Sequence, residues 1–247
     1  SIVPSASFTS YVEGGDVPSA GGVWVKGKSK ANLTLTGTGV YSSTISAYSI
    51  SGDGYTYNTS PVLTNYLSQA GNITFTGVVT DSRGRTGTAT TTLSVVDYTN
   101  PTISTAQVQR CDVDGNIDNN GEYVYISYGA SISSCSGENT PNRVYKVGYR
   151  IHNTGDYTYI PLTTNANSYS ATGMLYTDGI FAADRGSGTK LLLSTSNTYD
   201  IQLFVSDYFT TSISLQTLDT GFDLMNFNPS GKSMAIGKVS EAGASEE

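Results

Sequence analysis

Few residue types in this sequence could carry out catalysis. The chain has 1 histidine, His152, in the segment 149–155, and no serine or cysteine motif around it would make it the base of an activated nucleophile. Glycoside hydrolysis needs two carboxylates that face each other across a cleft, whereas the acidic residues here lie mostly in turn-forming segments. We therefore expect no enzyme, no catalytic residues and no cofactor.

A run of oxygen-bearing side chains is the clearest candidate for a metal site. Asp112, Asp114, Asn116 and Asp118 occupy alternate positions, which suits the oxygen ligands of calcium. In an EF-hand loop the sixth position is a glycine, but here it is Ile117, and no helical pattern flanks the run. The Asp-Gly and Asn-Gly pairs of the same segment are typical of turns in a β-hairpin. Both interpretations stay open, and we favour the hairpin loop.

Tyrosine is frequent, with 18 residues in the chain. Aromatic rings stack on the faces of sugars while the phenol hydroxyls stay hydrated, so a group of tyrosines can form a carbohydrate-binding surface. Tyrosine also suits the half-buried face of a sheet, which is the more general explanation. If a saccharide site exists, we expect it at Tyr157, Tyr159, Tyr169 and Tyr176, beside the polar segment 163–190.

The two cysteines, Cys111 and Cys135, have neither the spacing of a zinc site nor a C-x-x-C motif. A disulfide between them would be possible if they lay opposite each other on neighbouring strands. In a simple hairpin centred near 115–120, however, the two side chains do not face each other. We therefore favour two reduced, buried thiols, which behave as small apolar side chains.

The composition favours strands and argues against two classes of partner. Threonine, tyrosine and valine suit pleated surfaces, glycine, asparagine and serine suit turns, and strong helix formers are scarce. The formal net charge is -7 and no basic stripe is visible, so we expect no binding to nucleic acid. No apolar run approaches the roughly 20 residues that cross a bilayer, so we expect no membrane partner.

Alternation of apolar and polar residues defines the elements that must position these side chains. It is typical of strands with one dry and one hydrated face. In the first half of the chain the apolar positions are Leu33 and Leu35; Ile73, Phe75 and Val79; and Ala89, Leu93 and Val95. Turn-forming residues separate the strands at 13–16, 52–54 and 82–84. The segment 61–70 fits either a short helical turn or a loop that crosses between sheets.

The second half repeats this pattern. Its apolar rows are Val124, Ile126 and Tyr128; Tyr145, Val147, Tyr149 and Ile151; Tyr199, Ile201, Leu203 and Val205; and Ile213 and Leu215. The segment 163–190 is rich in asparagine, serine, glycine and aspartate, and we expect a long loop there. Long loops in compact domains are uncommon and often functional.

A weak internal repeat indicates two domains. Segments 79–86 and 205–210 each read as the end of a strand and a tight turn that carries an aspartate, before a final strand. This is how the last hairpin of an immunoglobulin-like sandwich would look. We expect each aspartate to cap its turn through the nearby backbone. Pro101 ends the first repeat and stiffens the connection.

The predicted fold class is therefore all-β, with tandem immunoglobulin-like β-sandwich domains at 1–98 and 99–218. Residues 219–247 form a third region, a hairpin around the turn 228–231 followed by a tail. Its apolar side chains are more than a hairpin can bury alone, which predicts an oligomerisation segment or a connection to a further domain. We expect the tail 241–247 to be disordered.

Three segments resemble minor structural and tail-fibre proteins of long-tailed phages that infect Gram-positive bacteria. The first joins Val79-Thr-Asp-Ser-Arg-Gly-Arg85 to 95–101, and the second joins Arg110-Cys-Asp-Val-Asp-Gly115 to 120–124. The third, Phe227-Asn-Pro-Ser-Gly-Lys-Ser-Met-Ala-Ile-Gly-Lys238, is the most specific. In that family a similar hairpin joins the stem to a trimeric head.

The resemblance implies a location in the virion, within the phage tail. It implies a homotrimer assembled through the C-terminal segment, contact with other phage tail proteins, and host cell-wall polysaccharide as a possible ligand. The expected function is a non-enzymatic structural and adhesive module of a tail fibre or tail tip that spaces and presents a host-receptor-binding region. Two alternatives stay open: the stalk of a bacterial cell-surface adhesin, and a carbohydrate-binding accessory domain of a secreted hydrolase.

Overall fold

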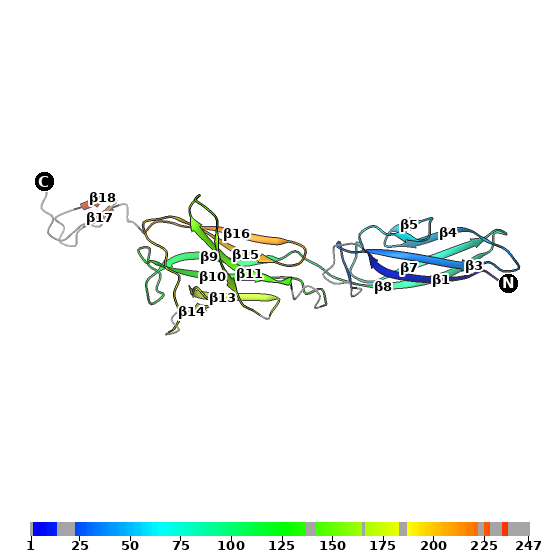
Figure 1. Ribbon diagram of the computed structural model, residues 1–247, viewed down its shortest axis with the longest axis horizontal. Coiled ribbons are helices and arrows are strands. Elements are labelled where there is room, and N and C mark those ends of the chain that lie inside the picture. The colour runs from blue at the N-terminus through cyan, green and yellow to red at the C-terminus, as the bar shows by residue number, and fades with distance from the viewer. Residues whose placement is uncertain are drawn as a thin grey trace. The chain divides into compact units, whose positions relative to one another are not determined.

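The computed structural model describes residues 2–13, 23–136, 142–164, 166–182 and 187–221, and the short strands 225–227 and 234–236. These residues contain the strands β1 to β18 and no α-helix (Figure 1), so the prediction of an all-β chain is confirmed. They also contain no helix with the length and hydropathy needed to cross a bilayer.

The chain divides into two compact units, each with its own hydrophobic core. Unit 1 comprises residues 1–100 with 133–142, and unit 2 comprises 101–132 with 143–247. Each unit is a sandwich of two mostly antiparallel sheets, as predicted from the alternating sequence.

Unit 1 consists of a three-stranded sheet and a five-stranded sheet. The first has the order β1 (Ser5–Glu13), β3 (Lys30–Thr38), β6 (Val62–Leu63). The second has the order β2 (Trp24–Val25), β8 (Thr86–Val96), β7 (Gly71–Asp81), β4 (Ile45–Gly52), β5 (Tyr55–Tyr57). All pairings are antiparallel except that of β2 with β8.

The core of unit 1 lies between these sheets and confirms the predicted rows. Leu33, Leu35, Phe75 and Leu93 are all buried, whereas the threonines between them face outward. Burial of one such side chain contributes about 1.5–3 kcal/mol relative to its exposed state. The two-residue period of the sequence therefore decides which side of each strand meets the core.

The segment 61–70 is a loop beside β3 rather than a helical turn. The backbone N–H of Thr64 donates to the carbonyl oxygen of Ala31 at 2.9 Å, and the Ala31 N–H donates to Thr64 Oγ1 at 2.9 Å. Leu67 is fully buried in the core, and its N–H donates to the carbonyl oxygen of Ser29 at 3.0 Å. Because these backbone groups bond to the edge of β3, the helical alternative is wrong.

Unit 2 consists of two four-stranded antiparallel sheets. The first has the order β14 (Phe181–Ala182), β13 (Ser168–Leu175), β10 (Tyr123–Ser131), β9 (Thr102–Cys111). The second has the order β12 (Thr158–Leu162), β11 (Val144–Ile151), β15 (Tyr199–Ser206), β16 (Thr211–Leu218). The strands β12 and β16 are the edges of this second sheet.

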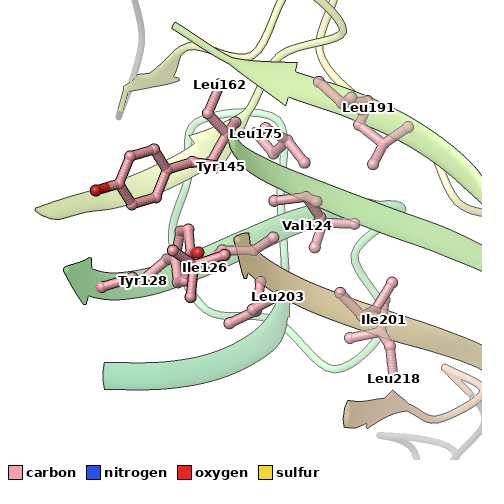
Figure 2. Packing of buried hydrophobic residues seen from close by; sticks show 14 of the residues in the cluster. Val124, Ile126, Tyr128, Tyr145, Leu162, Leu175, Leu191, Ile201, Leu203 and Leu218 are labelled. Atoms are coloured by element: carbon pink, nitrogen blue, oxygen red, sulfur yellow. The ribbon is translucent and has the colours of Figure 1, made fainter. Parts of the chain in front are cut away.

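Aliphatic side chains of both sheets meet in the core of unit 2 (Figure 2). Val124 and Ile126 on β10 face Ile201 and Leu203 on β15, and all four are fully buried. Tyr128 is also buried, and its hydroxyl donates to the carbonyl oxygen of Phe204 at 2.8 Å. Burial raises the pKa of Tyr128 well above its usual range, so the phenol remains neutral. The predicted rows on β10 and β15 are confirmed.

The long loop predicted across 163–190 is wrong for much of its length. Residues 168–175 form β13, which pairs with β10 from Ser131↔Ser168 to Tyr125↔Met174. The small and polar residues of this strand concealed it, because large aliphatic side chains occur only at its last two positions. Pairing with a neighbouring strand thus overrides a turn-like composition.

The aspartates of the two repeated turns are bound as predicted. In unit 1, Asp81 Oδ1 accepts the backbone N–H groups of Arg83 and Arg85 at 3.0 and 2.9 Å. In unit 2, Asp207 Oδ1 accepts those of Phe209 and Thr210 at 2.8 and 2.9 Å. Each carboxylate therefore caps the turn between the last two long strands of its unit.

The environment of Asp81 predicts how unit 1 responds to acid. Burial alone would raise the pKa of Asp81, but hydrogen bonds from Arg85, Ser43 and Arg83 outweigh it and lower that pKa from 3.8 to about 2. A depressed pKa in the folded state stabilises the protein above pH 4, and this contribution disappears between pH 4 and pH 2. We expect Asp81→Asn to lower the unfolding midpoint of unit 1 at neutral pH, with a difference from wild type that shrinks as the pH falls from 4 to 2.

Urea unfolding followed by tryptophan fluorescence measures this directly, because the single tryptophan, Trp24, packs against the core of unit 1. Asp53→Asn, on a turn of the same unit where the carboxylate accepts the N–H and the hydroxyl of Ser68, is a control for the loss of one hydrogen-bonded negative charge. A difference between wild type and Asp81→Asn that persists unchanged at pH 2 would contradict the prediction.

The two cysteines are reduced and buried, which confirms the favoured interpretation. Cys111 lies at the end of β9 with Met174 and Tyr176, and Cys135 belongs to unit 1. Burial raises the pKa of Cys111 to about 11, so its thiol is protonated and unreactive at neutral pH.

The C-terminal region contains β17 (Met225–Phe227) and β18 (Met234–Ile236), which pair antiparallel as the two strands of the predicted hairpin. The predicted turn at 228–231 and the predicted tail at 241–247 lie outside the described residues.

Candidate functional site

The outer face of the β12–β11–β15–β16 sheet carries an unusual set of side chains. Strand alternation buries Tyr145 and Val147 and turns the intervening residues of β11 outward, and the same holds for β15. We call three aromatic rings on this surface, together with the small or polar residues around them, the aromatic face. Its members are Tyr157, Tyr159, Phe204, Lys146, Gly148, Arg150 and Gln202.

Tyr159 lies across the sheet rather than upright on it. Gly148 pairs with Tyr159 on one side and with Gln202 on the other. The Tyr159 hydroxyl donates to Gln202 Oε1 at 2.8 Å, so the ring on β12 spans β11 and reaches β15. A Cβ at residue 148 would lie 2.7 Å from the Tyr159 ring and 3.3 Å from the Tyr157 ring. Only glycine leaves room for the two rings in this arrangement.

The rings form one connected group. The centroids of Tyr157 and Tyr159 are 6.0 Å apart with an interplanar angle of 31°. Tyr159 meets Phe204 edge to face, with the centroids 6.3 Å apart. These separations are typical of aromatic pairs, which hold each other's orientation. Tyr159 is 41% exposed, so the group is accessible to a ligand.

Two cations rest on these rings. The Lys146 ammonium lies 3.7 Å from the Tyr159 centroid and 4.0 Å from the Phe204 centroid. The Arg150 guanidinium lies 4.5 Å from the Tyr157 centroid. Such contacts stabilise exposed pairs by about 0.5–1 kcal/mol each and fix the cation beside the ring.

A polar cluster borders the aromatic face at Asp200. Its carboxylate accepts Arg150 Nε at 2.9 Å, meets His152 Nδ1 at 2.6 Å, and accepts the Asn153 N–H at 3.2 Å. Burial alone would raise the pKa of Asp200, but the bonds from His152, Asn153 and Arg150 lower it. The carboxylate is therefore ionised at neutral pH and holds Arg150 in place over Tyr157.

The structure separates the four tyrosines predicted as a saccharide site. Tyr157 and Tyr159 lie together on the aromatic face, beside β11 rather than beside the segment 163–190. Tyr169 packs against the core, stacked on Tyr145 with the centroids 5.6 Å apart, and burial raises its pKa to about 12. Tyr176 is 1% exposed. Of the four, only Tyr157 and Tyr159 share the aromatic face.

Three of the four residues of the calcium alternative bond within their own loop through their side chains. Asp112 Oδ1 accepts the N–H groups of Asp114 and Asn116 at 2.9 Å, and Asp118 Oδ1 accepts the Asn120 N–H at 2.9 Å. In the part of the chain that the structure describes, no group of three histidine, cysteine or acidic side chains is close enough to hold a metal ion. The calcium alternative stays a prediction.

A cavity of about 320 Å³ lies at one end of unit 2, between β9, β16 and the loops around Asn119 and Asp219. Arg110, which is 4% exposed, borders it. The Arg110 guanidinium donates to five backbone carbonyl oxygens, and these belong to Gly121, Leu193, Ser194, Asn197 and Asp219. Every N–H donor of the guanidinium is engaged. Arg110 therefore joins three loops and has no donor left for a ligand.

The sequence interpretation missed Lys146, Arg150, Gln202 and Phe204. The alternating sequence pattern contained the information needed to find them. Each of these residues lies between two residues of a predicted buried row, so its side chain had to face outward. What the sequence could not supply was the pairing of β11 with β12 and β15, which brings these residues beside Tyr159.

No protein-family model matches the sequence, and no curated protein sequence matches it. Solved structures show a distant likeness to this chain. One structure, described as a 1.5-MDa bacterial ice-binding adhesin and its retention on the host cell surface, is 13% identical, with a TM-score of 0.45 over 91% of this chain and 69% of that chain.

Two further structures are similar over most of both chains. The fibronectin(III)-like modules of Clostridium thermocellum CbhA are 14% identical, with a TM-score of 0.28 over 85% of this chain and 91% of theirs. A structure of carbohydrate-binding modules from the β-sandwich superfamily is 16% identical, with a TM-score of 0.32 over 89% of this chain and 97% of that one. At these identities the likeness concerns the fold alone.

Proposed function

We propose that the chain is a non-enzymatic adhesive module that binds a saccharide through the aromatic face of unit 2. The observation that carries this proposal is the pair of tyrosine rings laid over Gly148 and locked by the Tyr159–Gln202 hydrogen bond at 2.8 Å. Flat, partly exposed rings offer the apolar surface on which the C–H face of a sugar stacks. Because the sheet beneath the rings is rigid, little conformational entropy is lost when the ligand binds.

Polar groups around the rings complete such a site. Gln202 and Arg150 carry donors and acceptors in planar groups, which suit the neighbouring hydroxyls of a sugar. Asp200 fixes Arg150, so this group is already oriented in the free protein. A few oriented polar groups beside an apolar surface are the usual composition of a small-ligand site.

The biological setting of the proposal comes from the sequence resemblance. We assign the chain to a phage tail fibre or tail tip in the virion, where it would space and present a host-receptor-binding region beside other tail proteins. Residues 219–247 would hold three copies together. Light scattering on the chain tests this assembly, and a strict monomer would argue against it. Labelling of intact virions with antibodies against the chain tests the location.

The aromatic face equally favours one alternative, a carbohydrate-binding accessory domain of a secreted hydrolase. The molecular function of unit 2 would be the same in both settings. The gene context distinguishes them, because an accessory domain is encoded in one chain with a catalytic domain.

Replacement of Tyr159 tests the binding function. We expect Tyr159→Ala in the full chain to weaken saccharide binding about tenfold, because it removes the central ring and the contact with Lys146. A glycan array identifies bound saccharides, and calorimetric titration with a bound oligosaccharide gives the change. Tyr208→Ala is a matched control, since Tyr208 is also 41% exposed in unit 2 but lies outside the aromatic face. Equal losses for both variants, or no binding by wild type, would refute the proposal.

A further inference from the structure

Lys146 differs from the other cation of the aromatic face in its electrostatic partners. Arg150 is paired with Asp200 at 2.9 Å. The remaining ion pairs among the described residues join Lys26 to Asp97, Arg85 to Asp81, and His152 to Asp200. None of these includes Lys146, whose ammonium instead rests between the rings of Tyr159 and Phe204 at 3.7 and 4.0 Å.

Contact with aromatic rings leaves the charge of an ammonium group uncompensated. The rings attract the cation through their quadrupole but carry no net negative charge. An ammonium has three N–H donors, and aromatic rings satisfy them only weakly. Lys146 thus keeps both its charge and its hydrogen-bonding capacity for an acceptor that is not part of the described chain.

Lys146 lies close enough to the Tyr159 ring for one ligand to contact both residues. Lys146 pairs with Pro161 on β12 and with Phe204 on β15, so it lies in the middle of the sheet, one row from Gly148 and Tyr159. An acidic group bound to the Lys146 ammonium would lie no farther from the Tyr159 ring than the length of one sugar residue. The chain as a whole has a net charge of -7, so a local positive charge at this point is not a general property of its surface.

We propose that the aromatic face binds an anionic saccharide, with a carboxylate or phosphate group on Lys146 while a sugar ring packs against the part of the Tyr159 ring that Lys146 leaves exposed. This inference rests on the proposed saccharide-binding function and defines its ligand class. The anionic group forms a charge-assisted hydrogen bond with the ammonium, which a neutral sugar lacks. The aromatic stacking is common to both kinds of ligand, so the preference comes from Lys146.

Matched pairs of oligosaccharides test this preference in the full chain. One pair is tetragalacturonate and its methyl ester, and the other is phosphorylated maltotetraose and maltotetraose. We expect wild type to bind at least one acidic member roughly tenfold more tightly than its neutral partner, and to lose this difference in roughly 0.5 M NaCl. Lys146→Met, which retains an unbranched apolar stem beside the rings, should bind both members of that pair equally.

Lys190→Met is the matched control, because it removes the same charge from another position in unit 2 and should keep the preference. A carboxylate preference and a phosphate preference both support the inference and identify the acidic group. Equal binding of acidic and neutral members by wild type, or a preference that persists in Lys146→Met, would overturn the inference but leave the saccharide site intact. Absence of binding to all four probes and to the glycan array would overturn both.

Discussion

Arg110→Met should destabilise unit 2 by about 3–5 kcal/mol while unit 1 is unaffected, because each unsatisfied buried acceptor costs about 1–3 kcal/mol. The guanidinium is 4% exposed and bonds to five carbonyl oxygens on three loops. Methionine fills a similar volume but leaves these oxygens without their donor, and an unsatisfied buried acceptor costs more than the bond itself contributes. Arg110→Lys should recover only a part of this loss, because one ammonium cannot reach all the acceptors.

Urea unfolding measured with two probes isolates the effect. Trp24 fluorescence reports unit 1, whereas far-ultraviolet circular dichroism reports the strands of both units. The dichroism transition should move to lower urea while the fluorescence transition stays in place. Arg143→Met, which removes a guanidinium with a bond to the Thr164 carbonyl oxygen at 3.2 Å, should cost less than about 1 kcal/mol. Similar losses of unfolding free energy for Arg110→Met and Arg143→Met would show that the bonds from Arg110 to the five carbonyl oxygens do not stabilise unit 2.

Gly148→Val should abolish saccharide binding without unfolding unit 2. A Cβ at this position lies 2.7 Å from the Tyr159 ring and 3.3 Å from the Tyr157 ring, so both rings must leave the sheet surface and Tyr159 must release Gln202. Loss of two stacking positions predicts binding at least about a hundredfold weaker. Valine is a good strand residue, and the rings above it are on the solvent side, so the unfolding midpoint should change little.

Thr217→Val is the control for this variant, because it adds a branched apolar residue to the same sheet face on β16. It should leave both binding and stability near wild type. A Gly148→Val protein that binds as tightly as wild type would show that the flat arrangement of the rings has no part in recognition. A Gly148→Val protein that does not fold would be replaced in the test by Tyr157→Ala with Tyr159→Ala, for which the same loss of binding is expected.

The strand pattern was readable from the sequence where one side of a strand is buried and the other is exposed. Tyr199, Ile201, Leu203 and Val205 are all buried and alternate with residues that face outward. The same rule failed on β16, where Ile213 and Leu215 are 49% and 65% exposed. Apolar and polar residues alternate along this edge strand. The register with β15 decides which of the two sets faces the core.

The candidate site was less accessible to sequence reasoning, for a physical reason. Tyr157 and Tyr159 were predicted as ligand contacts from their residue type alone. Their orientation depends on Gly148, which is a neighbour only through the pairing of β11 with β12. Tyr169 has the same residue type but packs against the core, since β13 is a strand and not the predicted loop. Residue type identified the chemistry, and strand pairing decided which residues share a surface.

The first and last strands of both sandwiches are long and are paired over most of their length. In unit 1 these are β1, paired with β3 from Ser5 to Glu13, and β8, paired with β7 over most of its length. In unit 2 they are β9, paired with β10, and β16, paired with β15 from Thr211 to Leu218. Tension applied to the chain ends acts along these strands, perpendicular to their hydrogen bonds, so many bonds must break together before a strand can slide. Such loading in shear makes each sandwich resist extension.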